Sequence, residues 1–361
     1  MRIVQIAPLE ERVPPLKYGG IELVVYNLTE ELIKMGHTVY LIASGDSKSS
    51  AEILPVFPKS IRKLPQAQDM KMRDALKFIG VGRVVELLKK INVDIIHNHL
   101  GWRLLPFSHL FKAPIITTLH GPLNIKYQKV VYGNFKKYFY VSISNNQRRS
   151  LPSLNYVKTI YNGIDIKEFQ FNNKPKNYFA FLGRMSPEKG AKEAIKVAKR
   201  AGVKLKMAAK IDVVDKDYFE KQLSPFIDGK QIKFIGEIGS KERNIFLRNA
   251  IALLTPIQWE EPFGLYFIES MACGTPVIAF KRGSVPEIIK DGLTGFICKA
   301  NDINSMIKAV KKISQMPGKE YLKMRYNCRE HVEKNFTAKR MTDEYEKIYY
   351  KILKNIKKGK V

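Results

Sequence analysis

The chain has 361 residues, 45% of them hydrophobic and 11% aromatic, and a formal net charge of +28 at pH 7. This length indicates two domains rather than one core, and the composition excludes an intrinsically disordered chain. No apolar run approaches the roughly 20 residues that a membrane-spanning helix needs.

The strong positive charge predicts attraction to an anionic partner and indicates nothing about the fold. The sequence has no RNP-type motif, zinc-finger spacing or Gly-rich clamp, so we expect no specific nucleic-acid partner. Two interpretations stay open. One is peripheral contact with an anionic membrane face, and the other is a lysine-rich composition without a partner.

Three cysteines, Cys273, Cys298 and Cys328, lack the paired spacing of zinc or redox sites. Residues 1–8 resemble a first core strand rather than a signal peptide. We therefore expect a cytoplasmic protein, and attachment to the inner face of the membrane remains an alternative.

Hydrophobic periodicity predicts two cycles of strand, loop and helix, which indicate α/β layers built on parallel sheets. Ligands bind at the carboxyl edge of such sheets, where polar residues follow the predicted strands. In chain order, the first half contains strand 3–7, helix 21–35, strand 38–43, helix 76–91 and strands 94–97, 115–119 and 138–142. The second half contains strand 178–182, helix 190–201 and strands 205–209, 232–235, 252–255 and 277–280.

Two further segments complete this organisation. The polar segment 165–177 predicts an interdomain linker. Residues 342–358 carry an apolar helical stripe with lysines opposite. We expect this helix to pack on the protein, and a basic helix on a membrane surface is the alternative.

Two glutamates, Glu261 and Glu269, flank the turn 262–265. We expect Glu261 in a loop before a helix, Glu269 about two turns along that helix, and exposed backbone amides in the turn. Carboxylates accept hydrogen bonds from hydroxyl groups, and free amides at a helix start favour an anion. Sugar hydroxyls, ribose hydroxyls and phosphate together describe a nucleotide sugar.

A basic loop at 183–190 follows the first strand of the second half and carries Arg184 and Lys189. We expect a helix to begin after Pro187. Arginine can bind two phosphate oxygens at once and lysine adds a mobile charge, so this loop predicts a diphosphate site.

In the first half, Gly19 and Gly20 lie between a strand and a helix, where they permit close backbone approach. Their spacing is not Gly-x-Gly-x-x-Gly, which disfavours a dinucleotide site. Glu22 could accept a hydrogen bond at the helix start or contact a substrate, and both roles stay open.

Three histidines follow predicted strands in the first half. His120 comes after strand 115–119, where it can bind a sugar hydroxyl. His97 and His99 share one face of a strand end, but no third metal ligand is evident. We therefore expect no metal site, and acceptor contact at His99.

Together these motifs resemble the glycosyltransferase family 4 enzymes, in a prokaryotic branch of the family. The resemblance covers nearly the whole chain in order. The matching segments are Gly19-Gly20, His120-Gly121, 162–165, 183–190, 261–269, 274–276, 283–288 and 292–296.

The resemblance implies an α/β fold of the GT-B type: two Rossmann-like parallel-sheet domains face a central cleft, and a C-terminal helix crosses back to the first domain. Residues 1–165 would bind the acceptor, 166–340 would bind the nucleotide sugar, and 341–361 would form the crossing helix. It also implies retaining transfer of a hexosyl group from a UDP-, GDP- or ADP-linked sugar to a hydroxyl group of a glycan, lipid or small molecule. No metal and no cofactor would be required.

Carried over to this chain, the resemblance implies four catalytic residues. Arg184 and Lys189 would neutralise the leaving diphosphate, a role that a metal plays elsewhere. Glu261 would hold hydroxyls of the donor sugar, and His120 would contact its 6-hydroxyl.

The remaining implied roles concern binding. Tyr18 and His99 would contact the acceptor. The further donor-binding residues would be Gly19, Gly20, Lys210, Phe263, Gly264, Leu265 and Glu269, of which Glu269 would take the ribose hydroxyls. Lys210 stands where many relatives have a glycine-rich turn, so the choice of base stays open.

Three alternatives remain beside this prediction. A phosphorylase of the same fold would need a pyridoxal lysine site and a longer chain. A nucleotide-sugar epimerase should lack this arrangement of Arg184, Lys189, Glu261 and Glu269. A basic polyanion-binding protein without catalysis should have lost at least one of these residues. The sugar, the acceptor, the linkage and the oligomeric state stay open.

Overall fold

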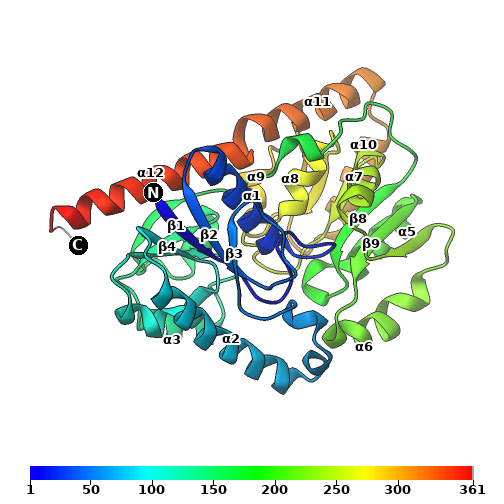
Figure 1. Cartoon of the computed structure of the whole chain (residues 1–361). Helices are drawn as coiled ribbons and strands as arrows, with labels where there is room; N and C mark the ends of the chain where they lie inside the picture. The colour runs from blue at the N-terminus through cyan, green and yellow to red at the C-terminus, as the bar shows by residue number, and fades with distance from the viewer. Residues whose placement is uncertain (360–361) are drawn as a thin grey trace. The chain divides into compact units, whose positions relative to one another are not determined.

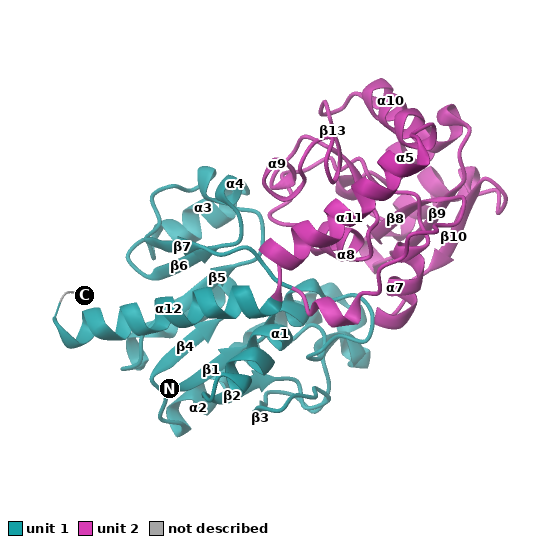
Figure 2. Cartoon of the chain, turned by 90° about the horizontal axis from the view of Figure 1, so that it is seen from above, with its two compact units in different colours: residues 1–163, 338–361 teal, residues 164–337 magenta. Residues whose placement is uncertain are grey.

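The structure is a computed structural model that describes residues 1–359 (Figure 1). The chain forms two compact units, coloured separately in Figure 2. The first unit comprises Met1–Gly163 and the segment from Ala338 onward, and the second comprises Ile164–Thr337.

The first unit is built on a seven-stranded sheet in the order β3-β2-β1-β4-β5-β6-β7, in which all strands are parallel. The inner strands are buried along most of their length, as expected for a sheet covered on both faces. The strands are β1 (Arg2–Ile6), β2 (Thr38–Ala43), β3 (Glu52–Pro55), β4 (Ile95–Asn98), β5 (Ile115–Leu119), β6 (Phe139–Ser142) and β7 (Tyr156–Thr159). The helices are α1 (Gly20–Lys34), α2 (Met70–Lys90), α3 (Lys126–Gly133), α4 (Asn145–Arg149) and α12 (Ala338–Lys357).

The second unit repeats this plan on a six-stranded parallel sheet in the order β10-β9-β8-β11-β12-β13. The strands are β8 (Phe179–Arg184), β9 (Leu205–Lys210), β10 (Ile232–Gly236), β11 (Leu253–Thr255), β12 (Val277–Phe280) and β13 (Gly295–Cys298). The helices are α5 (Ala191–Ala201), α6 (Lys216–Tyr218), α7 (Ser240–Arg248), α8 (Leu265–Ala272), α9 (Val285–Ile288), α10 (Ile303–Ser314) and α11 (Gly318–Asn335).

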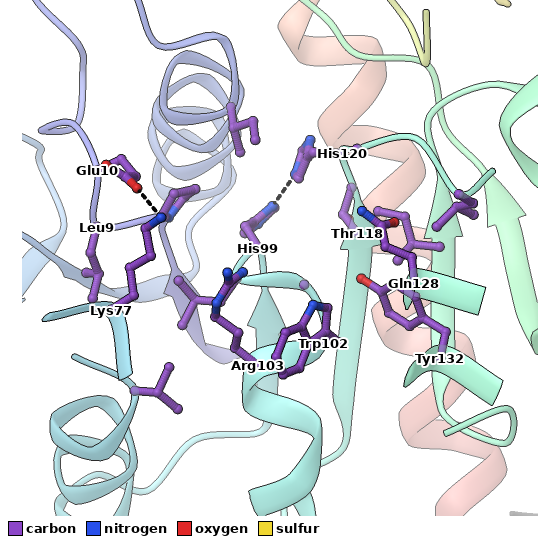
Figure 3. Close-up of a pocket in the computed structure, with 18 of the residues that line it drawn as sticks. Leu9, Glu10, Lys77, His99, Trp102, Arg103, Thr118, His120, Gln128 and Tyr132 are labelled. Carbon is purple, nitrogen blue, oxygen red and sulfur yellow. Dashed lines mark hydrogen bonds and ion pairs between the residues drawn. The ribbon is translucent and has the colours of Figure 1, made fainter. Parts of the chain in front are cut away.

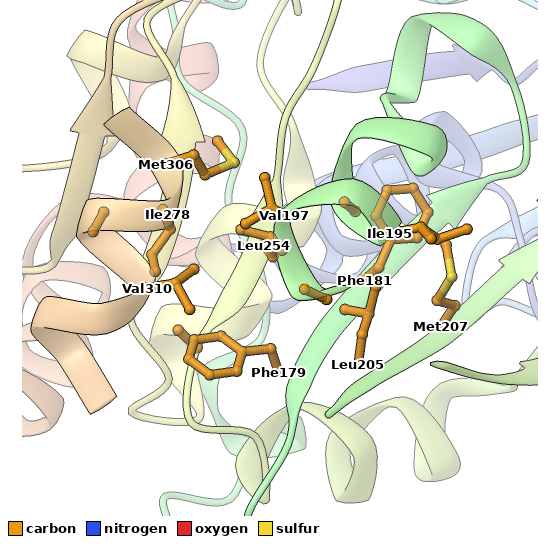
Figure 4. Packing of buried hydrophobic residues seen from close by; sticks show 14 of the residues in the cluster. Phe179, Phe181, Ile195, Val197, Leu205, Met207, Leu254, Ile278, Met306 and Val310 are labelled. Carbon is orange, nitrogen blue, oxygen red and sulfur yellow. The ribbon is translucent and has the colours of Figure 1, made fainter. Parts of the chain in front are cut away.

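The core of the second unit lies between its sheet and the helices α5 and α10 (Figure 4). Phe179 and Leu205 from the strands and Val310 from α10 are buried in this cluster. Burial of this apolar layer holds the strand ends in register, which fixes where the loops at the carboxyl edge begin.

The prediction of two parallel α/β layers is confirmed, with corrections of detail. Strands β3, β7 and β13 were not predicted. All three are four-residue edge strands, and β3 and β7 are also partly exposed. Helix α2 begins at Met70 rather than at residue 76, and the side chain of Asp69 caps it by accepting a hydrogen bond from the Met72 amide at 2.7 Å.

The predicted linker 165–177 lies inside the second unit, which corrects the sequence-based interpretation. Phe169 is buried, and the Asn172 amide donates to the carbonyl oxygen of Arg248 at 3.1 Å. Arg325 is fully buried and donates to the Asn172 carbonyl oxygen at 2.8 Å. The segment is polar because its side chains and backbone satisfy these buried partners, not because it is a free linker.

Helix α12 belongs to the first unit and packs beside α1. Its apolar stripe is buried at Tyr345, Ile348, Tyr349 and Ile352. No helix within residues 1–359 combines the length and the apolarity that crossing a membrane requires.

Candidate functional site

The first cluster of predicted site residues lies at the carboxyl edge of the second sheet. Strands β8 and β11 are neighbours although β9 and β10 intervene in the sequence, so the strand order reverses between them. Ligands of open α/β sheets bind at such a reversal. The loop after β8 carries Lys189, and the loop after β11 carries Glu261.

These two loops bring Lys189 and Glu261 into direct contact. Lys189 Nζ lies 2.5 Å from Glu261 Oε2, and the same oxygen accepts from Trp259 Nε1 at 3.2 Å and from the Tyr266 hydroxyl at 2.9 Å. None of the described residues donates to Glu261 Oε1. The carboxylate is therefore fixed by three donors through one oxygen, and the other oxygen can accept from a ligand hydroxyl.

The close approach of the two loops depends on Gly190. Its φ is +76°, and a Cβ there would lie 1.9 Å from the carbonyl oxygen of Pro256. Only glycine fits this backbone contact. Lys189, the preceding residue, also lies over the rings of Trp259 and Tyr266, at 4.8 and 5.1 Å from their centroids. An ammonium has three donors, so Lys189 can hold Glu261 and still bind an anion.

Arg184 is the last residue of β8 and is paired in register with Lys210, the last residue of β9. It forms ion pairs with Glu188 and with Asp215, whose Oδ2 lies 2.8 Å from Arg184 Nε. This N–H is not aimed at the oxygen, and neither atom has a hydrogen-bond partner among the described residues. Burial raises the pKa of Asp215, although Arg184 opposes the shift.

Glu269 is the fifth residue of α8, so it lies little more than one turn along the helix, not the two turns predicted. It is only 2% exposed, and its Oε1 lies 2.7 Å from Arg243 Nη1. In the turn 262–265, Pro262, Phe263 and Gly264 are buried and Leu265 is partly buried. The Phe263 ring packs edge-on against Phe336 at 6.0 Å between centroids, so Phe263 offers a ligand its backbone only.

The second cluster lies in the first unit, where the strand order reverses between β1 and β4. A pocket of about 250 Å³ opens at the ends of β1, β4 and β5 (Figure 3). Its polar lining includes Glu10, Lys77, His99, Trp102, Arg103 and His120.

Hydrogen-bond directions among the histidines follow from Gln5 on β1. Its amide oxygen only accepts, so His99 Nε2 donates to Gln5 Oε1 at 2.9 Å. Burial, with smaller contributions from His97 and His120, holds the pKa of His99 well below its ordinary value, and burial lowers the pKa of His120 to about 3. Both rings are therefore neutral at pH 7. His99 Nδ1 is then bare and accepts from His120 Nε2 at 2.8 Å.

The histidine chain leaves His120 and His99 with different free hydrogen-bonding atoms. His120 presents an unprotonated Nδ1, which can accept a hydrogen bond from a hydroxyl group but cannot donate a proton. Both nitrogens of His99 already have partners. With both nitrogens hydrogen-bonded in this structure, His99 can orient His120, and acceptor contact at His99 stays a prediction.

The same glutamine connects the pocket to α12. Gln5 Nε2 donates to the Tyr349 oxygen at 3.4 Å, and the Tyr349 hydroxyl then donates to His97 Nδ1 at 2.6 Å. His97 Nε2 donates to Thr118 Oγ1 at 2.8 Å, which lies 2.9 Å from the Tyr345 oxygen. A buried network of this kind stabilises the fold only while every member keeps its partner.

Replacing Tyr349 by phenylalanine is expected to lower the free energy of unfolding by about 1–3 kcal/mol, because His97 Nδ1 and Gln5 Nε2 each lose a buried partner. Urea denaturation measures the change. The matched control is Tyr350→Phe, since Tyr350 is exposed on the same helix. Equal stability of the two variants would contradict the network.

Within residues 1–359, no three His, Cys, Asp or Glu side chains are grouped as metal ligands. Of the residues predicted from the sequence, Tyr18, Gly19, Gly20, His99 and His120 belong to the first unit and the others to the second.

Comparison with known proteins identifies the family to which the chain belongs. Residues 164–331 match the family described as Glycosyl transferases group 1, and residues 18–168 match the one described as Glycosyltransferase Family 4. The chain belongs to glycosyltransferase family 4. An N-acetyl-alpha-D-glucosaminyl L-malate synthase of Bacillus anthracis is 24% identical over 390 residues, which cover 95% of this chain and 97% of that protein.

Solved structures show the fold of this glycosyltransferase. Sucrose-phosphate synthase from Thermosynechococcus elongatus matches with a TM-score of 0.82 at 19% identity, covering 98% of this chain and 99% of that chain. The Anabaena protein HepE, in complex with UDP and glucose, matches with a TM-score of 0.76 at 16% identity. The match covers 97% of this chain and 100% of that chain. The predicted GT-B fold is confirmed.

Several residues of the candidate site were missed from the sequence. Trp259 and Tyr266 lie within five positions of Glu261 in the sequence and donate to its carboxylate. Aromatic donors so near a loop carboxylate could have been predicted as part of the site. Arg243 and Asp215 had no local signal, because their partners lie at distant positions in the chain. Arg103 was also missed. Its signal in the sequence was an adjacent tryptophan and arginine in the segment that follows strand β4.

Glu22, in the first turn of α1, folds back against the glycine loop. A Cβ on Gly19, whose φ is +152°, would lie 3.2 Å from Glu22 Oε2. Glu22 is buried, and burial raises its pKa from 4.5 to about 8. The folded protein therefore holds this carboxyl neutral at pH 7.

The raised pKa of Glu22 predicts a pH-dependent stability. Its contribution is fully present below pH 4.5 and is lost as the pH rises to about 8, since only the unfolded chain ionises in that window. Glu22→Gln should match the wild type near pH 4.5 and exceed it increasingly toward pH 8, by about 1.4 kcal/mol per unit of pKa difference. Thermal unfolding across pH tests this, with the exposed Glu52→Gln as control. A stability difference between Glu22→Gln and the wild type that does not change with pH would refute the raised pKa of Glu22.

Proposed function

We propose that this glycosyltransferase moves a hexosyl group from a nucleotide-diphosphate sugar to a hydroxyl group, with retention of configuration and without a required metal ion. The single observation that carries the proposal is the Lys189–Glu261 contact at the strand reversal of the second sheet. It places a cation for phosphate beside a carboxylate whose free oxygen can accept from a sugar hydroxyl.

The neighbouring residues would bind different parts of the donor: the diphosphate, the sugar and the ribose. Arg184 and Lys189, with Lys210 beside Arg184 in register, would neutralise the diphosphate. Glu261 would bind sugar hydroxyls, with the backbone of Phe263, Gly264 and Leu265. Glu269 would bind the ribose hydroxyls.

The first unit would bind the acceptor. His120 Nδ1 would accept a hydrogen bond from a donor-sugar hydroxyl. The glycine loop Gly19-Gly20 would lie against the diphosphate, and Tyr18, which is 37% exposed, would contact the acceptor.

In the proposed reaction, the acceptor oxygen forms a bond to the anomeric carbon on the face from which the phosphate oxygen departs. The bond from that carbon to the phosphate oxygen breaks, and the leaving phosphate oxygen takes the acceptor proton. No protein nucleophile and no general acid is needed, which agrees with a His120 that is neutral at pH 7. The Arg184 and Lys189 charges then stabilise the negative charge that develops on the diphosphate.

Two comparisons support the substrate class. The Anabaena relative is in complex with UDP and glucose. The Bacillus anthracis relative is named for an N-acetylglucosaminyl L-malate product, which unites a hexosaminyl group with a small hydroxyl-bearing acceptor.

A thermal-shift panel of UDP-, GDP- and ADP-linked sugars tests the donor class. One nucleotide should raise the melting temperature, and the corresponding nucleotide sugar should be hydrolysed slowly without an acceptor. Interconversion of two nucleotide sugars without loss of the nucleotide would instead indicate an epimerase. Protection by none of them would indicate a polyanion-binding protein.

We also propose a cytoplasmic protein that contacts anionic membranes peripherally. All three cysteines are free and buried, and the net charge is +28. Helix α2 exposes Phe78 at 75% and Ile79 at 48%. Anionic liposomes should sediment the protein at low salt and release it at high salt, because salt screens such contacts. Equal sedimentation with neutral liposomes, or none with either, would contradict this.

A further inference from the structure

The pocket of the first unit contains a cation that the proposed donor chemistry does not use. Arg103 lines the pocket of about 250 Å³ and also a neighbouring recess of about 380 Å³. Val81 and Trp102 line both spaces as well, so the two lie around the Arg103–Trp102 pair. In Figure 3 the Arg103 side chain rises beside Trp102 toward His99.

Arg103 is held by an aromatic face rather than by an acid. Its guanidinium carbon lies 5.0 Å from the centroid of the Trp102 ring. No carboxylate among residues 1–359 lies within ion-pair distance of it, and no described residue accepts a hydrogen bond from it. The contact with the ring uses none of the five N–H donors of the guanidinium, so they remain for a ligand.

The carboxylates that line these spaces are already neutralised by other cations. Glu10 lies 2.9 Å from Lys77 and 2.8 Å from Arg73, and Asp74 lies 3.2 Å from Lys77. Their negative charges are therefore neutralised by Arg73 and Lys77 and not by Arg103. A ligand in the pocket meets one uncompensated cation, which has the geometry that binds the two oxygens of a carboxylate or phosphate side by side.

We infer that the acceptor of this glycosyltransferase carries an anionic group, a carboxylate or a phosphate, which Arg103 binds while Trp102 packs against the acceptor's carbon skeleton. This inference rests on the proposed function, because it assigns the acceptor class for the same transfer. Arg103 selects the acceptor and takes no part in bond breaking.

Two pairs of probes test the inference and separate the two anions. L-malate is compared with dimethyl L-malate, and glycerol 3-phosphate with glycerol, each with the nucleotide sugar chosen by the thermal-shift panel. Release of the nucleoside diphosphate above the hydrolysis background is measured. We expect the anionic member of at least one pair to have a kcat/KM about 10- to 100-fold above its neutral partner.

The variant Arg103→Gln should lower kcat/KM for that anion by a similar factor and bring the ratio within the pair close to one. Arg103→Lys should recover part of the lost kcat/KM, because lysine restores the positive charge but not the planar group that binds two oxygens at once. The matched control is Arg83→Gln in the same unit. Arg83 lies 4.7 Å from the centroid of the Phe57 ring but does not line the pocket, so its variant should keep the wild-type ratio.

Equal use of the neutral and anionic probes in both pairs, or an Arg103→Gln variant that keeps the wild-type ratio, overturns the inference. If no probe is glycosylated, thermal shifts with L-malate and glycerol 3-phosphate alone decide. Protection by either that is lost in Arg103→Gln supports the inference, and protection by neither overturns it. Donor protection and donor hydrolysis are measured without an acceptor, so failure of the proposed function is distinguishable from failure of this inference.

Discussion

Alanine in place of both Arg184 and Lys189 is expected to lower kcat for sugar transfer by about 10²- to 10⁴-fold. Each residue offers the leaving diphosphate a charged hydrogen bond worth about 1.5–3 kcal/mol, and each 1.4 kcal/mol of lost stabilisation is tenfold in rate. Steady-state release of the nucleoside diphosphate measures the effect.

Removing Lys189 also leaves the buried Glu261 carboxylate with only its two aromatic donors. The variant's thermal unfolding must therefore be compared with that of the wild type before the rates are interpreted. The control Lys196→Ala with Arg200→Ala removes the same charge from exposed positions of α5. A folded Arg184/Lys189 variant with the turnover of this control would reject the diphosphate assignment.

Glu269→Gln is expected to weaken binding of the nucleoside diphosphate by about 10- to 100-fold, because a buried carboxylate accepts stronger hydrogen bonds from ribose hydroxyls than an amide does. Isothermal calorimetry measures the dissociation constant with the nucleotide that the thermal-shift panel selects. The exposed Glu220→Gln serves as the control.

Deoxy analogues separate a ribose contact from an indirect effect on Arg243, whose partner at 2.7 Å is also lost. The wild type should bind the 2′-deoxy or 3′-deoxy nucleotide more weakly than the parent nucleotide. Glu269→Gln should bind the parent and that analogue alike. A variant that still discriminates between them as the wild type does would refute the ribose role.

The fold could be predicted largely from the sequence because its inner strands are continuous apolar runs that end in polar loops. The errors have physical causes. Edge strands such as β3 are half exposed and lack that signal. The segment 165–177 has a linker's composition, but its polar groups bind the buried Arg325 and the end of α7.

The site could be predicted where its residues belong to short local motifs. Glu261, Lys189 and Arg184 stand in motifs that the sequence displays directly. Their partners could not be predicted, because the fold supplies them: Arg243 lies 26 positions from Glu269, and Gln5 lies 94 from His99. The hydrogen bonds at both nitrogens of His99 likewise come from residues distant in the chain, so the sequence could not show them.

The central claim is retaining transfer of a sugar from a nucleotide diphosphate without a required metal ion. The most direct measurement follows the reaction by proton NMR in buffer containing EDTA, with the donor that the thermal-shift panel selects. We expect the first sugar product to have the anomeric configuration of the donor, and we expect EDTA to leave the rate unchanged. An inverted product, or turnover that EDTA abolishes and Mg²⁺ or Mn²⁺ restores, would contradict it.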